Sequence, residues 1–279
     1  MKPMAIGVFS NSLHPSSPDE LFKRLEQLDL NVIQLGLIDP AWLKPDVVDR
    51  LEQLLKSSGV EVQASFFGFP GEDYSSIPRI RETGGFACDF EARLATVQEV
   101  IQISQRLGIK AVGAHMGFIP EEPDNPQYAV MIGRIRRIAG EMSDAGLRLL
   151  FETGQETPDG LLQVLSDVGR KNVAVNFDPA NILLYGVGGP IEAARKLGRH
   201  IASIHAKDAT PSGQRDVWGE EKLLGEGTVN YPLFLRTLRE VGFTGPLIIE
   251  CEIPGTDPMR NVTHARDRLR AWLSTAQHN

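Results

Sequence analysis

The sequence predicts a (β/α)8 barrel of the α/β class that spans residues 1–279 as one domain. Short apolar runs rich in Val, Ile and Phe alternate with longer segments of helical periodicity, and this alternation repeats eight times. No linker or change in composition divides the chain, which favours one barrel over two domains. A doubly wound open sheet is the alternative, but no glycine-rich phosphate-binding turn follows the first strand.

The strand predictions follow the apolar runs in order along the chain. They are residues 5–10, 32–37, 60–67, 110–116, 147–152, 172–178, 201–206 and 246–251. Helical spacing of apolar residues, such as Leu21, Leu25 and Leu28, fills the segments between them. Ser17 followed by Pro18 is typical of a helix start, and glycines before several strands are typical of helix ends.

Two connections are too long to be simple turns. Residues 68–89 follow the third predicted strand and carry Tyr74 and the pair Gly84-Gly85, while residues 209–230 follow the seventh. Loops of this length in a barrel are usually binding loops or lids. We expect the first to be a lid with glycine hinges over the carboxyl ends of the strands, where barrel enzymes place their active sites.

Composition excludes several classes of protein. The formal net charge is −7 without a long basic run, which argues against nucleic-acid or anionic-membrane partners. Cys88 and Cys251 lie far apart and form no CxxC motif, so we expect neither a disulfide framework nor a thiolate metal site. No apolar run reaches membrane-spanning length and the first residues lack an export signal, so the expected location is the cytoplasm.

Four consecutive strand predictions end on metal-ligand residue types. Glu152, Asp178, His205 and Glu250 end the fifth to eighth strands. A buried carboxylate is costly unless it is paired, hydrogen-bonded or bound to a metal, and carboxylates with imidazole suit Mn, Zn, Co, Mg or ferrous Fe. Taken alone, Asp178 before Pro179 is equally typical of a helix N-cap. Four such residues on one rim favour a single metal site.

Two further polar residues end strands on the same rim. His115 ends the fourth strand, where it is interpreted as a metal ligand, a substrate hydrogen-bond donor or a histidine satisfied by a backbone carbonyl. Gln34 lies in an otherwise apolar run near the end of the second strand. Its side chain is expected to contact substrate or to support Glu250.

The segments FETG, NFDPAN, SIHAKD, LLGEGTVNYPLF and GPLIIECE carry a family resemblance. With these motifs the chain resembles the sugar phosphate isomerase/epimerase superfamily, the xylose isomerase-like TIM barrels. This superfamily includes ketose 3-epimerases, L-ribulose-5-phosphate 3-epimerase, hydroxypyruvate isomerase, inosose dehydratase and endonuclease IV. The resemblance covers essentially the whole chain.

The resemblance implies one divalent metal ion held by Glu152, Asp178, His205 and Glu250, with the two glutamates also acting as acid and base. A metal between two oxygens of an α-hydroxy ketone stabilises the enediolate that forms when a neighbouring proton leaves. Return of the proton on the opposite face gives epimerisation, and return to the neighbouring carbon gives isomerisation.

Three more residues are assigned to substrate binding. Asn181 stands where several relatives of the superfamily have a histidine that contacts substrate or a second metal, which argues against a multi-metal site. Lys207 is interpreted as an anion-binding or acid/base lysine, or as the ion-pair partner of a nearby carboxylate. Arg215, in the long seventh loop, resembles the arginine that reaches the site in ketose epimerases.

The expected function is therefore a metal-dependent isomerase or epimerase of a small sugar, polyol or sugar phosphate. An inosose- or shikimate-type dehydratase begins with the same enolisation and stays an alternative. An endonuclease IV-like phosphodiesterase needs several metals and more histidine than this chain offers. A barrel that only binds a ligand is disfavoured because both glutamates are present. The sequence leaves open whether the chain forms a homo-oligomer.

Overall fold

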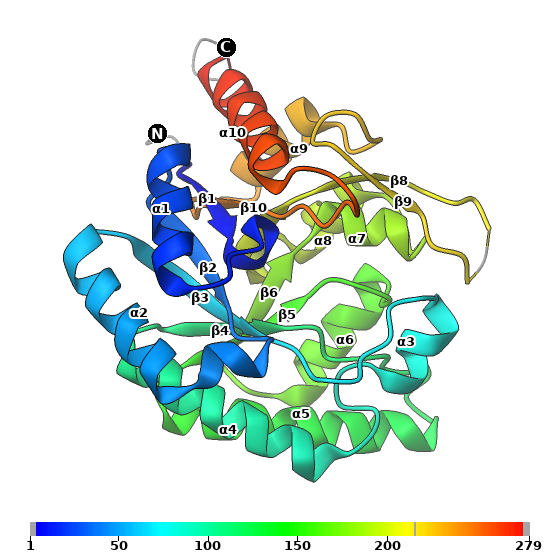
Figure 1. The fold of residues 1–279 in the computed structure, drawn as a ribbon. Coiled ribbons are helices and arrows are strands. Elements are labelled where there is room, and N and C mark those ends of the chain that lie inside the picture. Colours follow the sequence, from blue (N-terminus) through cyan, green and yellow to red (C-terminus); the bar gives the residue numbers. More distant parts are fainter. Residues whose placement is uncertain (1–3, 215, 276–279) are drawn as a thin grey trace.

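Eight parallel strands close into a barrel in the computed structural model, which describes residues 4–214 and 216–275 (Figure 1). The strand order around the barrel is β1-β10-β7-β6-β5-β4-β3-β2. The strands are β1 (Ile6–Phe9), β2 (Val32–Gly36), β3 (Glu61–Phe67), β4 (Ala111–Ala114), β5 (Arg148–Glu152), β6 (Val173–Phe177), β7 (Ile201–Ala206) and β10 (Leu247–Ile249). This confirms the predicted fold, with every strand inside its predicted run.

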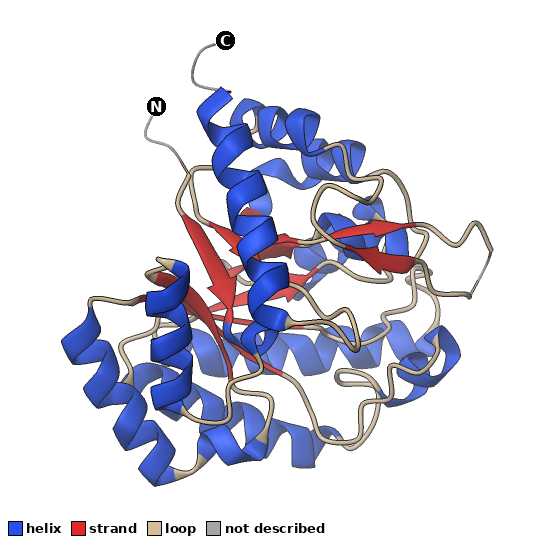
Figure 2. Cartoon of the chain, turned by 45° about the horizontal axis from the view of Figure 1, so that its top comes forward, coloured by secondary structure: helices blue, strands red, loops and turns tan. Residues whose placement is uncertain are grey.

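Helices surround the barrel (Figure 2). They are α1 (Pro18–Leu28), α2 (Pro45–Ser58), α3 (Ile77–Thr83), α4 (Phe90–Arg106), α5 (Pro126–Asp144), α6 (Pro158–Val168), α7 (Pro179–Leu184), α8 (Pro190–Leu197), α9 (Tyr231–Glu240) and α10 (Pro258–Thr275). Short 3-10 helices lie at Ser10–Leu13, Pro40–Leu43 and Gly198–His200. No helix among the described residues is long and apolar enough to cross a membrane.

Local sequence signals explain where these helices begin and end. Ser17 accepts a hydrogen bond from the Glu20 amide and precedes Pro18, the first residue of α1. Gly59 follows α2 with a φ of 70°, and Gly242 follows α9 with a φ of 81°. Residues with a side chain rarely adopt this left-handed conformation, so glycine ends each helix before the next strand at low cost.

The two long connections are more ordered than a loop prediction implies. Residues 68–89 contain α3, and the segment after β7 forms a hairpin in which β8 (Asp208–Thr210) pairs antiparallel with β9 (Glu220–Lys222). The buried Asp208 carboxylate accepts backbone hydrogen bonds from Gly225, Gly227 and Val229. These bonds fold the rest of the connection back onto β8. With α3 and α7, the hairpin lies at the right of the barrel in Figure 1.

The inside of the barrel changes from apolar to polar along the strands. Ala64, Ala111, Leu150 and Ala174 form a small apolar cluster separate from the main core. Alternate residues of a strand share a face, so Glu152 lies on the same face of β5 as Leu150, one layer further along. The four predicted metal ligands therefore lie above an apolar layer, at the carboxyl ends of the strands.

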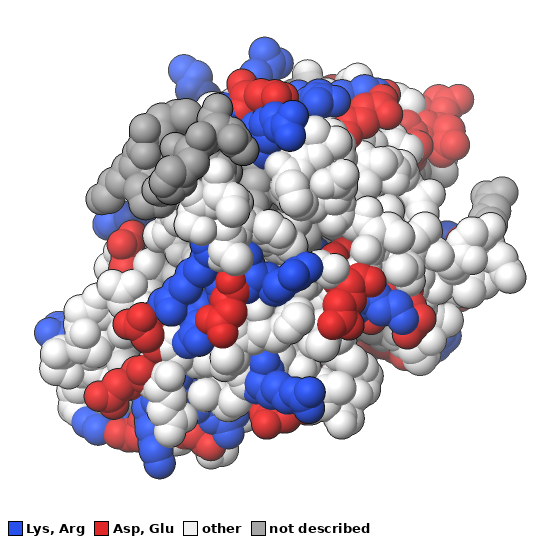
Figure 3. Space-filling view, turned by 90° about the horizontal axis from the view of Figure 1, so that it is seen from above, with Lys and Arg blue, Asp and Glu red and all other residues white. Residues whose placement is uncertain are grey.

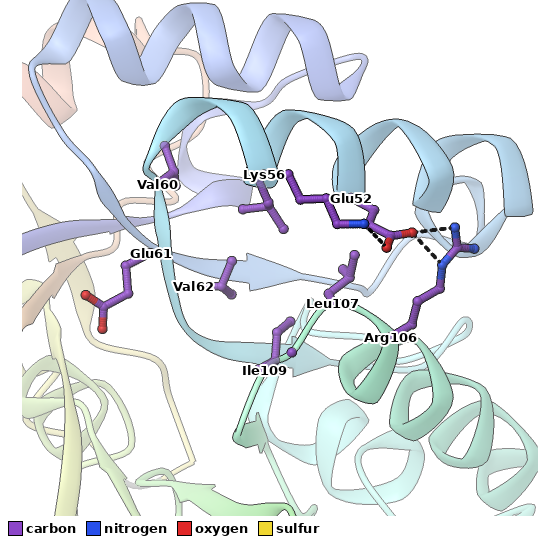
Figure 4. Close-up of a pocket in the computed structure, with 10 residues that line it drawn as sticks. Glu52, Lys56, Val60, Glu61, Val62, Arg106, Leu107 and Ile109 are labelled. Carbon is purple, nitrogen blue, oxygen red and sulfur yellow. Dashed lines mark hydrogen bonds and ion pairs between the residues drawn. The ribbon is translucent and has the colours of Figure 1, made fainter.

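The other end of the barrel carries a hollow of about 340 Å³ (Figure 4). Its walls include Val60, at the start of β3, and Ile109, just before β4. Glu52 forms ion pairs there with Lys56 at 2.6 Å and Arg106 at 2.7 Å. These charged groups satisfy one another, and the amino-terminal face of a barrel serves stability rather than catalysis.

Charge is mixed on the outer surface. Figure 3, which views the molecule from the top of Figure 1, shows basic and acidic side chains interspersed over that face. The atoms drawn there form no continuous basic surface, whereas proteins that neutralise nucleic-acid phosphates need one.

Candidate metal centre

Four side chains converge at the carboxyl ends of neighbouring strands. Glu152 ends β5, Asp178 follows β6, His205 lies in β7, and Glu250 follows β10. One ligand atom from each residue can be chosen so that all four lie within 4.8 Å of one another. Ligand atoms around one ion at about 2.2 Å lie at most about 4.4 Å apart, so a small closure would complete the site.

His205 is oriented by two different partners. Its Nε2 atom lies 2.6 Å from the Gln34 side-chain oxygen, while Nδ1 lies 2.8 Å from Glu152 Oε1 and 3.0 Å from Glu250 Oε2. The amide oxygen can only accept, so Nε2 carries a proton and donates it to Gln34. Nδ1 faces the carboxylates and donates to them while the ring is protonated. Loss of that proton would leave a lone pair in the direction that a metal-binding histidine needs.

Gln34 is completely buried, so the structure places it behind His205 rather than in the open part of the site. From the sequence, Gln34 is expected to contact substrate or to support Glu250; the structure shows a contact with His205, and contact with substrate stays a prediction. A glutamine suits this position because its oxygen faces the imidazole while its nitrogen remains free to donate on the other side.

Asp178 has two oxygens in different surroundings. Oδ1 accepts hydrogen bonds from the Ala180 and Asn181 amides and caps α7. Oδ2 is buried, has no hydrogen-bond partner and lies 4.0 Å from His205 Nδ1. The N-cap and the metal-ligand interpretations are therefore compatible, because they use different oxygens. An unpartnered buried carboxylate oxygen fits a cation and is costly without one.

Glu250 is held by a buried lysine. Lys207 Nζ lies 3.3 Å from Glu250 Oε2, 2.7 Å from Glu252 and 3.8 Å from Glu221, and the Lys207 residue is only 4% exposed. Of the roles considered from the sequence, these contacts favour ion pairing with neighbouring carboxylates. Burial lowers the pKa of Lys207, but Glu250, Glu252 and Glu221 together raise it well above its usual range.

The electrostatics of the cluster favour an added cation. Burial raises the pKa of Glu152 and Asp178 above their usual range. Burial acts the same way on Glu250, but the charges of His205 and Lys207 outweigh it and lower the pKa of that carboxyl. Burial opposes a charge on His205, whereas Glu250 and Glu152 raise its pKa well above the usual value. The His205 imidazolium, with Lys207 beside Glu250, thus faces three carboxyl groups, and a divalent ion in place of the Nδ1 proton would neutralise more of their charge.

A layer of polar side chains lies beneath the cluster, and the strand patterns alone were not read as predicting it. The Gln34 amide nitrogen donates to Asn176 at 3.0 Å and to Ser203 at 3.1 Å, inside the barrel. Asn176 lies two residues before Asp178, and Ser203 lies two residues before His205. That spacing places each polar residue on the same strand face as a ligand and would have identified the layer.

His115 lies beside the cluster rather than in it. Its Nδ1 accepts from the Gly117 amide at 3.3 Å, and its Nε2 lies 3.2 Å from the Tyr185 hydroxyl. Burial lowers the pKa of His115 to about 4, so the ring is neutral at pH 7 and donates from Nε2 to Tyr185. A Cβ atom on Gly154 would approach that nitrogen to 2.4 Å, which explains the glycine in FETG.

The other two substrate assignments have different outcomes. The Asn181 side chain donates to the Thr153 carbonyl at 3.0 Å, linking the start of α7 to the segment after β5. This contact supports the segment that follows Glu152, and binding of substrate by Asn181 stays a prediction. Arg215 lies outside the described residues.

The segment of residues 68–89 packs on the same rim. The Phe86 amide donates to the Met116 carbonyl, just after β4, and Arg81 pairs with Asp216 of the seventh connection at 2.6 Å. A Cβ on Gly85 would lie 2.1 Å from the Gly117 nitrogen. Gly85 is thus explained by close packing rather than by a hinge, and closure as a lid stays a prediction.

Glu156 should make stability depend on pH. Burial, with the nearby charge of Glu121, raises its pKa from 4.5 to about 8. Between these values the folded state binds more protons than the unfolded chain, so the free energy of unfolding falls as pH rises, by up to about 1.4 kcal/mol per unit. In urea titrations at pH 5.5 and 8.5, Glu156→Gln should gain stability over wild type at the higher pH. The exposed neighbour Glu122 provides the control Glu122→Gln, and equal pH slopes for all three proteins would contradict the prediction.

The chain matches a known family along most of its length. A family model described as the xylose isomerase-like TIM barrel matches residues 22–272. The crystal structure of a xylose isomerase domain protein from Planctomyces limnophilus is similar, with a TM-score of 0.89 and 32% identity. That match covers 99% of this chain and 100% of the other.

Two sequence relatives are more distant. A protein of unknown function from Methanocaldococcus jannaschii is 28% identical over 190 residues, and the match covers 63% of this chain and 61% of that protein. An L-ribulose-5-phosphate 3-epimerase from Escherichia coli is 23% identical over 230 residues, 67% of this chain and 79% of that enzyme. The family model and the closed barrel agree, and the chain belongs to the xylose isomerase-like TIM barrel family.

Proposed function

We propose that this protein is a divalent-metal-dependent epimerase or isomerase of a keto sugar. One observation carries the proposal: Glu152 and Glu250 approach the same His205 nitrogen at 2.8 and 3.0 Å, beside the unpartnered oxygen of Asp178. Two carboxylates that share one ion can also lie on two sides of a substrate bound to it. The 3-epimerase activity of the relative from Escherichia coli supports the same class of reaction.

The four residues of the cluster would hold the ion. When bound, a divalent ion would polarise the substrate carbonyl and stabilise the charge that develops on its oxygen. One glutamate removes the proton next to the carbonyl, and the other returns a proton. Gln34 keeps His205 in the correct tautomer, and Lys207 fixes the position of Glu250.

Aromatic rings shield this chemistry from water. The rings of Phe9 and Phe66 lie 5.7 Å from the His205 ring, centroid to centroid, and both phenylalanines are buried. An apolar wall strengthens the electrostatic interactions on its inner side, because water cannot screen them there. Negative charge that develops on the substrate oxygen would therefore be stabilised by the charged groups of the site rather than by water.

Hydrogen exchange tests the proposal directly. The metal-loaded protein, incubated in D₂O with a panel of ketoses, keto-sugar phosphates and inososes, should introduce deuterium next to the carbonyl of at least one compound. Mass spectrometry and proton NMR measure the label, and a chelator-treated sample is the control. If no compound gains deuterium above the chelator control, the enolisation chemistry proposed here is wrong.

The same experiment separates the alternatives by their products. An epimer or an aldose identifies the proposed reaction, whereas loss of water identifies the dehydratase that shares its first step. A phosphodiesterase of the endonuclease IV type would need further metal ligands, and the described residues provide one four-residue cluster.

A further inference from the structure

A second cavity of about 700 Å³ opens on the rim, and we call it the rim cleft. Its walls come from α3, the segment after β4, the residues after β5, the end of α7 and residues 211–214. Phe118, Gln155 and Tyr185 line it. These segments all belong to the carboxyl-end face of the barrel, which is the face that carries the candidate metal centre.

The rim cleft adjoins that centre through Tyr185 and Gln155. The Tyr185 hydroxyl contacts His115, whose Nε2 atom leaves no room for a side chain on Gly154, two residues after Glu152. Gln155 follows Gly154 directly and donates to the Gly117 carbonyl. A ligand in the cleft can therefore extend from a group held at the metal centre.

The size of the rim cleft exceeds what one reacting sugar needs. Pockets of about 300–1,000 Å³ hold drug-sized ligands, which are larger than a pentose or hexose. A single ketose bound between Glu152 and Glu250 would leave the rim cleft to water. The cavity is instead large enough for a second ring attached to the reacting one.

The lining of the rim cleft suits an uncharged sugar ring. Phe118 and Tyr185 meet edge to face at 6.0 Å, and Trp218 packs against Tyr185 at 4.7 Å. Aromatic faces bind the C–H face of a sugar ring, because the ring face is partly negative and C–H groups are partly positive. Gln155 lines the cleft, and its buried Oε1 atom has no hydrogen-bond partner, so this wall carries an unsatisfied acceptor for a hydroxyl group.

The charges of the described lining residues do not favour a phosphate. Arg81 is the basic residue among the described lining residues, and it pairs with Asp216 at 2.6 Å. Its guanidinium also lies over the Phe118 ring at 4.9 Å. Glu121 adds a negative charge to the same wall. Phosphate groups are usually bound by unpaired arginines, lysines or helix N-termini.

We propose that the substrate is a keto sugar that carries a second, uncharged glycosyl unit, and that the rim cleft binds this unit. The inference rests on the proposed function and narrows its substrate class. The metal centre would hold the ketone and its neighbouring hydroxyl, and Phe118 and Tyr185 would stack against the second ring.

Four ketoses with the same reacting carbons test this inference. They are fructose, fructose 6-phosphate, and fructose with a glucosyl group on O4 or on O6. Calorimetry with the metal-loaded protein measures each dissociation constant, and deuterium uptake from D₂O measures each reaction. At least one glucosyl-fructose should bind about tenfold more tightly than fructose, and fructose 6-phosphate should bind no better than fructose.

Two matched variants assign the extra affinity to the rim cleft. Phe118→Ala should lower affinity for the preferred disaccharide by about fivefold to tenfold, the worth of one aromatic contact, and leave fructose unaffected. Phe90→Ala is the control, because Phe90 is also half-buried beneath an arginine, Arg134, but lies outside the cleft. Phe90→Ala should bind both sugars like wild type.

The outcomes separate this inference from the proposed function. Deuterium uptake by fructose without any preference for a disaccharide would overturn the inference and keep the function. A disaccharide preference that depends on Phe118, without deuterium uptake by any ketose, would keep the rim cleft and overturn the function. Tighter binding of fructose 6-phosphate than of fructose would overturn the proposal that the rim cleft binds an uncharged sugar ring. Because the wild-type affinities decide the main question, the test does not depend on the folding of a variant.

Discussion

Glu250→Gln and Glu152→Gln should each lower turnover by about a hundredfold or more while the protein still binds a divalent ion. Glutamine keeps the size of the side chain and one acceptor oxygen but cannot take up a proton at neutral pH. Removal of a positioned general base typically costs two to four orders of magnitude. The measurement is kcat on the substrate found by deuterium exchange, with the metal content of each variant determined by elemental analysis.

Glu252→Gln is the matched control for this pair. Glu252 lies two residues after Glu250 and contacts the same lysine at 2.7 Å, but its side chain is 59% exposed and lies outside the four-residue cluster. This variant should retain turnover within a few fold. If metal-loaded Glu250→Gln exchanged substrate protons at the wild-type rate, that glutamate would be a ligand only, and the two-carboxylate mechanism would have to be abandoned.

Asp178→Asn should separate metal binding from helix capping. Asparagine caps helices about as well as aspartate, so the bonds to the Ala180 and Asn181 amides can persist and stability without metal should change by less than about 1 kcal/mol. The variant loses the anionic oxygen that faces His205. We expect affinity for Mn²⁺ or Zn²⁺ to fall at least about tenfold to a hundredfold, the size of effect seen when metal sites lose even supporting groups.

Thermal unfolding with and without metal reads out both effects. A ligand at a hundred times its dissociation constant stabilises a protein by about 2.7 kcal/mol, which corresponds to roughly 5–10 °C for a domain of this size. Wild type should show this shift, and Asp178→Asn should lose most of it from an unchanged starting temperature. Asp178→Ala should lose both the cap and the shift. A full metal shift in Asp178→Asn would show that Asp178 serves only as a cap.

Local patterns in the sequence were sufficient to predict the barrel fold. Each apolar run produced a strand, and glycines such as Gly59 and Gly242 stand with positive φ where the sequence predicts helix ends. These signals are local because strand and helix periodicity and turn conformation depend on nearby residues. The order within the long connections escaped prediction, since β8 and β9 pair only through a hairpin that Asp208 organises from a distance.

The candidate site also combines features that the sequence predicts with features that only the tertiary structure shows. Parallel strands of a barrel all point one way, so the sequence alone determined that Glu152, Asp178, His205 and Glu250 share a rim. Only the tertiary structure decided what stands behind them, because the partners are distant in sequence: Gln34 contacts His205 across 171 positions. It also decided that Asp178 can serve both as cap and as ligand, since a residue type cannot reveal which oxygen is already satisfied. Periodicity determines the direction of a side chain, whereas the packing of the closed barrel determines its partners.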